Sequence, residues 1–74
     1  MKKLPKGFEG MMQYEKGGIV TNPYTSEKTK LNSLELSIYD AIKGAEMFGL
    51  WNVVENGLDW FKKNNAKAYM ILLD

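Results

Sequence analysis

The clearest pattern of apolar residues lies between residues 31 and 48, LNSLELSIYDAIKGAEMF. Apolar positions recur there every three or four residues, which is the spacing of one face of an α-helix. Asn32 stands at an N-cap position and Glu35 follows three residues later, the arrangement of a capping box. Gly49 is a natural C-terminal stop. These features predict a helix over residues 33–48, at the centre of the fold.

Two shorter helical patterns follow toward the C-terminus. The first predicts a helix over about residues 53–63, with Asn52 as its cap. The second predicts a helix over 66–73, with Asn65 as its cap. This last helix is apolar on almost every side, so we expect it to be buried, either between other elements or in an oligomer interface.

Two glycines lie inside the predicted helices. Glycine in a helix interior costs about 1 kcal/mol relative to alanine. A close helix crossing at Gly44 would account for the first. Gly57 is expected to face inward among apolar residues and to weaken the middle of its helix.

The N-terminal half of the chain lacks the helical spacing of apolar residues. Residues 11–24 predict a β-hairpin around a two-residue turn at Gly17-Gly18, ending at Asn22-Pro23. A short further strand near residues 28–30 is left open. Residues 1–9 carry lysines, Pro and Gly without periodicity and are predicted to be a flexible basic segment.

The predicted fold class is therefore small α+β. An N-terminal β-hairpin packs on a three-helix core, and residues 10–74 form a single globular domain. The alternative is an all-α three-helix domain with an irregular N-terminal arm, in which the two glycines form a bare loop.

The side of the central helix opposite its main apolar stripe is mixed in character. Leu36 and Met47 bracket Asp40 and Lys43 there. Either another element covers this side, or it is a partner surface. In a two-fold dimer, Asp40 of one chain could lie near Lys43 of the other. The candidate interface residues are Leu36, Tyr39, Asp40, Lys43, Met47, Trp51, Ile71 and Leu72.

The amino-acid composition excludes several kinds of catalytic and metal-binding site and points to none. The chain has 74 residues with neither Cys nor His, which removes the usual zinc ligands, general base and nucleophile. We therefore expect no enzyme activity, no catalytic residue, no cofactor and no metal. A chain of this size without disulfides gains most from a partner copy, so a homodimer is predicted.

Charge argues against a nucleic-acid role without removing it. The net charge is +1, and all ten basic residues are Lys, so the forked contacts of Arg to phosphate and guanine are missing. No apolar run resembles a signal peptide or a membrane span, so a cytoplasmic location without membrane contact is expected. The alternative basic patch consists of Lys2, Lys3, Lys6, Lys62, Lys63 and Lys67.

Three segments together carry a resemblance to known proteins. They are GGIVTNPYT (17–25), LELSIYDAIKGAEM (34–47) and WFKKNNAKAYMILLD (60–74), about half of the chain. The set resembles a group of short proteins of unassigned activity from tailed bacteriophages that infect marine cyanobacteria. The resemblance implies the infected bacterial cytoplasm as the compartment, and it carries over no catalytic residue.

The leading functional hypothesis is a non-enzymatic interaction module, a phage accessory protein that binds itself and, as a further candidate partner, a host protein. The alternatives are a weak lysine-based nucleic-acid-associated protein and a minor virion component.

Overall fold

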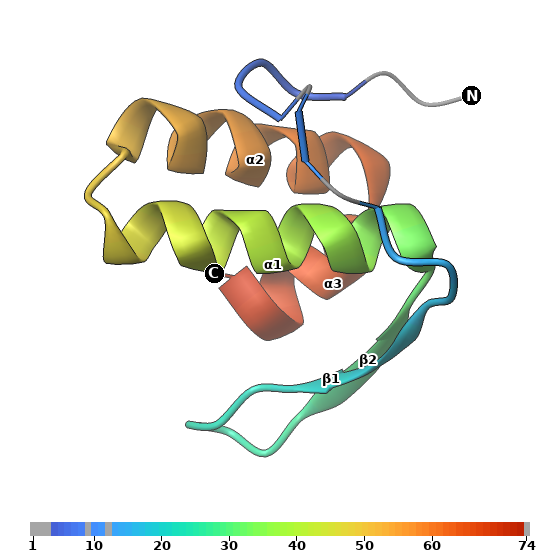
Figure 1. Cartoon of the computed structure of the whole chain (residues 1–74). Coiled ribbons are helices and arrows are strands. Elements are labelled where there is room, and N and C mark those ends of the chain that lie inside the picture. The colour runs from blue at the N-terminus through green and yellow to red at the C-terminus, as the bar shows by residue number, and fades with distance from the viewer. Residues whose placement is uncertain (1–3, 9, 12, 74) are drawn as a thin grey trace.

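Two helices, α1 (Ser33–Met47) and α2 (Trp51–Asn64), lie antiparallel side by side and form the frame of the fold (Figure 1). The computed structural model describes residues 4–8, 10–11 and 13–73. A short C-terminal helix packs against the frame, and a two-stranded antiparallel hairpin extends beside it. The predicted small α+β class is confirmed.

The start of α1 agrees with the prediction in atomic detail. Asn32 Oδ1 accepts a hydrogen bond from Glu35 N at 2.8 Å, and Glu35 Oε1 accepts one from Asn32 N at 2.9 Å. This reciprocal pair is a capping box, which satisfies two backbone donors at the helix start. Leu31, just before the cap, and Ile38 and Ile42, on the predicted stripe, are fully buried.

The close crossing of the two helices occurs at Gly57, not at Gly44. A Cβ atom on Gly57 would lie 2.5 and 2.7 Å from the side chain of Ile42 and 2.9 Å from Phe8. A Cβ on Gly44 would meet no described atom within 4 Å. Gly57 therefore does not simply weaken α2. Its missing side chain is what allows α1, α2 and the N-terminal segment to meet.

The hairpin exists, but in a different part of the chain from the one predicted. Its strands are β1 (Gly18–Thr21) and β2 (Lys28–Leu31), with Gly18 opposite Leu31. The expected turn at Gly17-Gly18 is wrong: a Cβ on Gly17 would clash with the carbonyl of Leu31, so Gly17 serves a close approach of two backbones. The open alternative of a strand near 28–30 supplies the true partner of β1.

The turn of the hairpin is built around Asn22. Its Oδ1 accepts from the backbone N–H of Tyr24 at 2.8 Å, an Asx turn that starts the reversal. Its Nδ2 donates to the carbonyl of Ile71 at 2.8 Å. Because the last carbonyls of a helix lack partners within the helix, this bond both satisfies Ile71 and fastens the hairpin to the C-terminal segment.

The described part of the predicted N-terminal segment 1–9, residues 4–8, packs on the domain, and its flexibility stays a prediction; residues 1–3 and 9 lie outside the described part of the chain. Phe8 is only 2% exposed and belongs to the core. Gly7 has a φ of +97°, and Asn56 Nδ2 donates to Lys6 O at 3.1 Å. The segment thus lies along α2, anchored by an aromatic side chain and a hydrogen bond (Figure 1).

Of the two N-caps predicted for the later helices, Asn52 is wrong and Asn65 is confirmed. Helix α2 begins at Trp51, before Asn52, and its N-cap Leu50 makes no side-chain cap. Asn65 does cap α3 (Ala66–Ala68), accepting from Ala68 N at 3.2 Å. The chain then continues as η1 (Tyr69–Leu73), a π-helical segment whose Leu72 is buried.

Glu35 joins these elements through its second carboxylate oxygen. Oε2 accepts from Asn65 Nδ2 at 3.0 Å, while Oε1 caps α1. Glu35 is only 6% exposed, yet both of its carboxylate oxygens accept hydrogen bonds. One carboxylate therefore holds the start of α1 against the start of α3.

We expect Gly57→Ala to lower the free energy of unfolding by about 1–3 kcal/mol, because the added methyl group overpacks a filled core. Gly44→Ala is the matched control and should raise it by up to about 1 kcal/mol, since the site is open and alanine favours helix. Urea denaturation followed by circular dichroism measures both. Equal effects of the two changes would contradict the assigned crossing point.

Glu35→Ala should lower the free energy of unfolding by about 1–3 kcal/mol, because Asn32 N and Asn65 Nδ2 both lose their acceptor. Glu35→Gln should fall between wild type and the alanine variant. Its single amide oxygen can still cap Asn32, but its NH2 group then faces the NH2 of Asn65. Thermal unfolding monitored at 222 nm provides the ranking, and a glutamine variant as stable as wild type would argue against the Asn65 contact.

Candidate interaction surface

Four large apolar side chains are exposed together where α1 turns into α2. Met47, Phe48, Leu50 and Trp51 are 85%, 80%, 53% and 61% exposed, and we call them the apolar corner. They occupy five consecutive positions interrupted only by Gly49. Trp is among the residue types that dominate binding energy at protein interfaces, and Phe and Met are enriched there.

The backbone of this corner is a well-defined helix C-cap. Leu50 N donates to Ala45 O at 2.9 Å and Gly49 N donates to Glu46 O at 3.2 Å, which are the two bonds of a Schellman motif. Gly49 takes the left-handed conformation that the motif requires, with a φ of +70°. The corner is therefore a fixed feature of the α1–α2 joint, and its side chains project from a defined turn.

The corner is also free of charge. No Lys, Asp or Glu occurs between Glu46 and Glu55. With roughly 150–250 Å² for each aromatic side chain and somewhat less for Met and Leu, the exposed fractions correspond to roughly 500 Å² of apolar surface. An apolar patch of that size lies in the range that marks functional surfaces on monomeric proteins.

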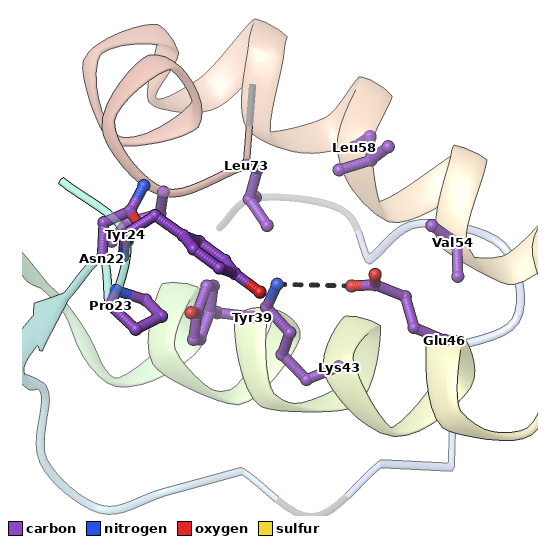
Figure 2. A pocket seen from close by; sticks show the side chains of 10 residues that line it. Asn22, Pro23, Tyr24, Tyr39, Lys43, Glu46, Val54, Leu58 and Leu73 are labelled. Carbon is purple, nitrogen blue, oxygen red and sulfur yellow. Dashed lines mark hydrogen bonds and ion pairs between the residues drawn. The ribbon is translucent and has the colours of Figure 1, made fainter.

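A hollow of about 460 Å³ lies between α1, α2, η1 and the hairpin turn (Figure 2). Its apolar lining comes from α2 and η1, and its polar rim comes from the hairpin turn and α1 (Figure 2). Two of its lining residues lie next to the corner along the chain: Glu46 directly precedes Met47, and Val54 follows Trp51 by about one turn of α2. The hollow is lined by Asn22, Pro23, Tyr24, Tyr39, Lys43, Glu46, Val54, Leu58, Leu72 and Leu73.

The charges on the rim are already partnered. Lys43 Nζ lies 3.4 Å from Glu46 Oε1 and 5.5 Å from the centre of the Tyr39 ring. Tyr24, by contrast, is 95% exposed and extends from the hairpin turn over the hollow (Figure 2). The site thus offers aromatic and aliphatic surface with one balanced ion pair, which suits the burial of an apolar group.

The predicted interface residues do not form one exposed face. Leu36 is half-buried and packs against the core, and a Cβ on Gly18 would lie 3.8 Å from its Cδ2. Leu72 is buried and Ile71 is half-buried. Other elements of the domain therefore cover Leu36, Ile71 and Leu72, which is the first of the two alternatives that the sequence leaves open, and their place among the candidate interface residues is corrected.

Of the remaining predicted residues, Met47 and Trp51 lie in the apolar corner, and Tyr39 and Lys43 line the hollow. Phe48 and Leu50 are not among the predicted interface residues, because helical periodicity places Phe48 on the apolar face of the central helix and Leu50 lies just after the predicted stop at Gly49. The uncharged run between Glu46 and Glu55 is the sequence signal that could have identified them.

Asp40 is engaged within the chain. Tyr14 Oη donates to Asp40 Oδ2 at 2.7 Å, and Tyr14 N donates to Ser37 Oγ at 2.8 Å. The hydrogen bond to Asp40, then its negative charge, then partial desolvation raise the pKa of Tyr14 above its ordinary value of 10.0. The segment before β1 is thereby tied to α1, on the face where a contact between Asp40 and the Lys43 of another chain had been expected.

The alternative basic patch is only partly gathered. Lys6 and Lys63 border a shared hollow at the end of α2, but Asp59 lies in the same hollow. Lys62 Nζ stands 5.1 Å from the centre of the Tyr69 ring, and Lys67 is exposed on α3. Lys2 and Lys3 lie outside the described residues.

Comparison with known proteins adds no family. No protein-family description, curated protein or solved structure matches the chain. Among residues 4–8, 10–11 and 13–73, no helix has the length and apolarity needed to cross a membrane. Within the same described part, no three acidic side chains gather closely enough to hold a metal ion.

Asp40→Asn should lower the pKa of Tyr14 toward its ordinary value, because the charged acceptor that favours the protonated phenol is lost. In the wild type, the folded-state pKa is raised, so the stability from this bond is complete below about pH 10 and is lost as the pH rises through the raised value. NMR titration of protein labelled at tyrosine Cζ resolves the four phenols individually. Asp59→Asn is the control, and an unshifted Tyr14 in Asp40→Asn would refute the assignment.

Proposed function

We propose that the protein is a non-enzymatic interaction module that self-associates through the apolar corner. The single observation that carries this proposal is the exposure of four large apolar side chains on one rigid, uncharged turn. Leaving such a patch in water forgoes about 25 cal/mol for each Å² that a partner would cover. A partner that covers it gains this energy without burying a charge.

The described carboxylates on α1 support a binding role over catalysis. Glu35 caps α1 and accepts from the Asn65 side chain, Asp40 accepts from Tyr14, and Glu46 pairs with Lys43. General acid–base chemistry needs a group placed next to a substrate with a pKa tuned to its task. These three carboxylates already have partners in the fold, and the chain has no His or Cys to add.

A role as a phage accessory protein in the infected bacterial cytoplasm remains part of the proposal and rests on the sequence resemblance alone. The same corner could engage a host protein when it is not occupied by another copy. The mixed charges around the lysines near the end of α2 do not favour the nucleic-acid alternative.

Sedimentation velocity should give an apparent mass above the 8.5 kDa of one chain, rising with concentration in the micromolar range. Trp51→Lys should weaken association at least ~30-fold, which corresponds to a loss of about 2 kcal/mol for a central aromatic anchor. Ile19→Lys is the matched control, because Ile19 is 69% exposed on β1, outside the corner.

A wild-type chain that sediments as a monomer at every concentration would overturn the proposal of self-association. A control variant that loses association as fully as the corner variant would contradict an interface confined to the corner, because the hairpin would then take part as well. Circular dichroism of both variants verifies that the fold is intact.

A further inference from the structure

We propose that the self-associated form is a reciprocal dimer in which the apolar corner of each copy enters the hollow of the other. This inference rests on the proposed self-association and specifies its geometry: each site is completed by residues of the second copy. The occupant of the hollow is thus an indole and its apolar neighbours from an identical chain.

The first argument is the area that a stable dimer needs. A standard interface buries about 800 Å² on each partner, and the corner offers roughly 500 Å². Two corners meeting face to face would therefore fall short. The hollow provides further surface beside the corner, including the ring of Tyr24, which is 95% exposed, and the half-buried Leu58 and Leu73.

The second argument is the position of the two features. The hollow begins at Glu46 and Val54, the residues that flank the corner on α1 and α2. A protruding patch beside a hollow can form a two-fold symmetric dimer. In such a dimer the patch of the first copy contacts the hollow of the second, and the patch of the second copy contacts the hollow of the first. The corner stands on the joint between α1 and α2, and the hollow is enclosed by these two helices together with η1 and the hairpin turn (Figures 1 and 2).

The third argument is chemical fit. A hollow of about 460 Å³ lies within the range of roughly 300–1,000 Å³ that holds small organic groups. Its lining is part apolar and part polar, and the two charges in it, Lys43 and Glu46, already pair with each other, so an uncharged corner would leave no charge desolvated without a partner. Lys43 already lies over an aromatic ring at 5.5 Å, and an indole entering the hollow would offer its ammonium a second ring.

The test uses two variants, each blocking one half of the junction. Trp51→Lys blocks the corner and leaves the hollow intact. Leu73→Glu blocks the hollow and leaves the corner intact. Each variant alone should lose association at least ~30-fold at each of its two junctions. In an equimolar mixture, one native junction re-forms, and at the other junction the introduced ammonium faces the introduced carboxylate.

Sedimentation velocity of the mixture should therefore show dimer at concentrations where each variant alone is monomeric. If circular dichroism shows that Leu73→Glu is unfolded, Tyr24→Glu replaces it, because a side chain that is 95% exposed does not support the fold. The control mixture combines Trp51→Lys with Ile19→Lys, whose corner and hollow are both unaltered. It should give the dimer of Ile19→Lys alone and a mixed dimer with one native junction, in which no introduced charges face each other.

Three results would overturn the inference. A hollow variant that associates like wild type, while Trp51→Lys is monomeric, would mean that corners meet each other, and the proposed function would stand without this geometry. Two monomeric variants that stay monomeric when mixed would reject the reciprocal junction. A monomeric wild type would reject both the inference and the proposed function.

Discussion

The buried carboxylate of Glu35 is the contact on which the arrangement of the helices depends. It accepts from Asn32 N at the start of α1 and from Asn65 Nδ2 at the start of α3. An ionised or neutral carboxyl buried without partners would be costly, so its two bonds must form together with the packing that buries it. The position of the C-terminal segment is thereby fixed relative to α1, and with it the lining of the hollow that Leu72 and Leu73 provide.

A second constraint is the amount of core that so short a chain can make. Two of its largest buried side chains, Phe8 and Ile42, meet at Gly57, where α1, α2 and the N-terminal segment converge. Trp60 packs edge-on against Phe61 with ring centres 5.2 Å apart. This core lies between the helices, and the joint at Gly49 projects beyond it. The apolar corner is outside the core for this geometric reason, not because its residues are polar.

The parts of the fold that could be predicted are those determined by neighbouring residues. The capping box at Asn32 and the cap at Asn65 depend on side chains within three positions of each other, and both predictions were confirmed. The strand pairing could not be read in this way. Gly17-Gly18 has the chemistry of a hairpin turn, but the glycines are needed where the chain passes the carbonyl of Leu31, a contact fourteen residues away in sequence from Gly17. The role of Phe8 likewise depends on a distant glycine on α2.

The candidate site was predictable only in part for the same reason. Helical periodicity assigns Phe48 to the buried stripe, but periodicity assumes that the partner element extends as far as the helix does. Here α2 begins only a few residues after α1 ends, so no part of α2 covers Met47 and Phe48, and both side chains are exposed. Trp51 and Met47 were identified as candidates, whereas Leu36 and Leu72 are covered by elements whose positions no local pattern defines.

The chemistry of the corner bears on why its side chains are apolar at all. The Schellman turn requires Gly49 in a left-handed conformation and two backbone hydrogen bonds, and any polar residue at positions 47, 48 and 51 would satisfy the same backbone. At the position after the C′ glycine, which Leu50 occupies, an apolar side chain commonly packs against the preceding helical turn. The side chains of Met47, Phe48 and Trp51 have no comparable role in holding the turn, and their exposure opposes solubility. The fold therefore does not account for their identity, whereas the proposed self-association would, with the hollow lined by Leu58 and Leu73 as the proposed place of contact.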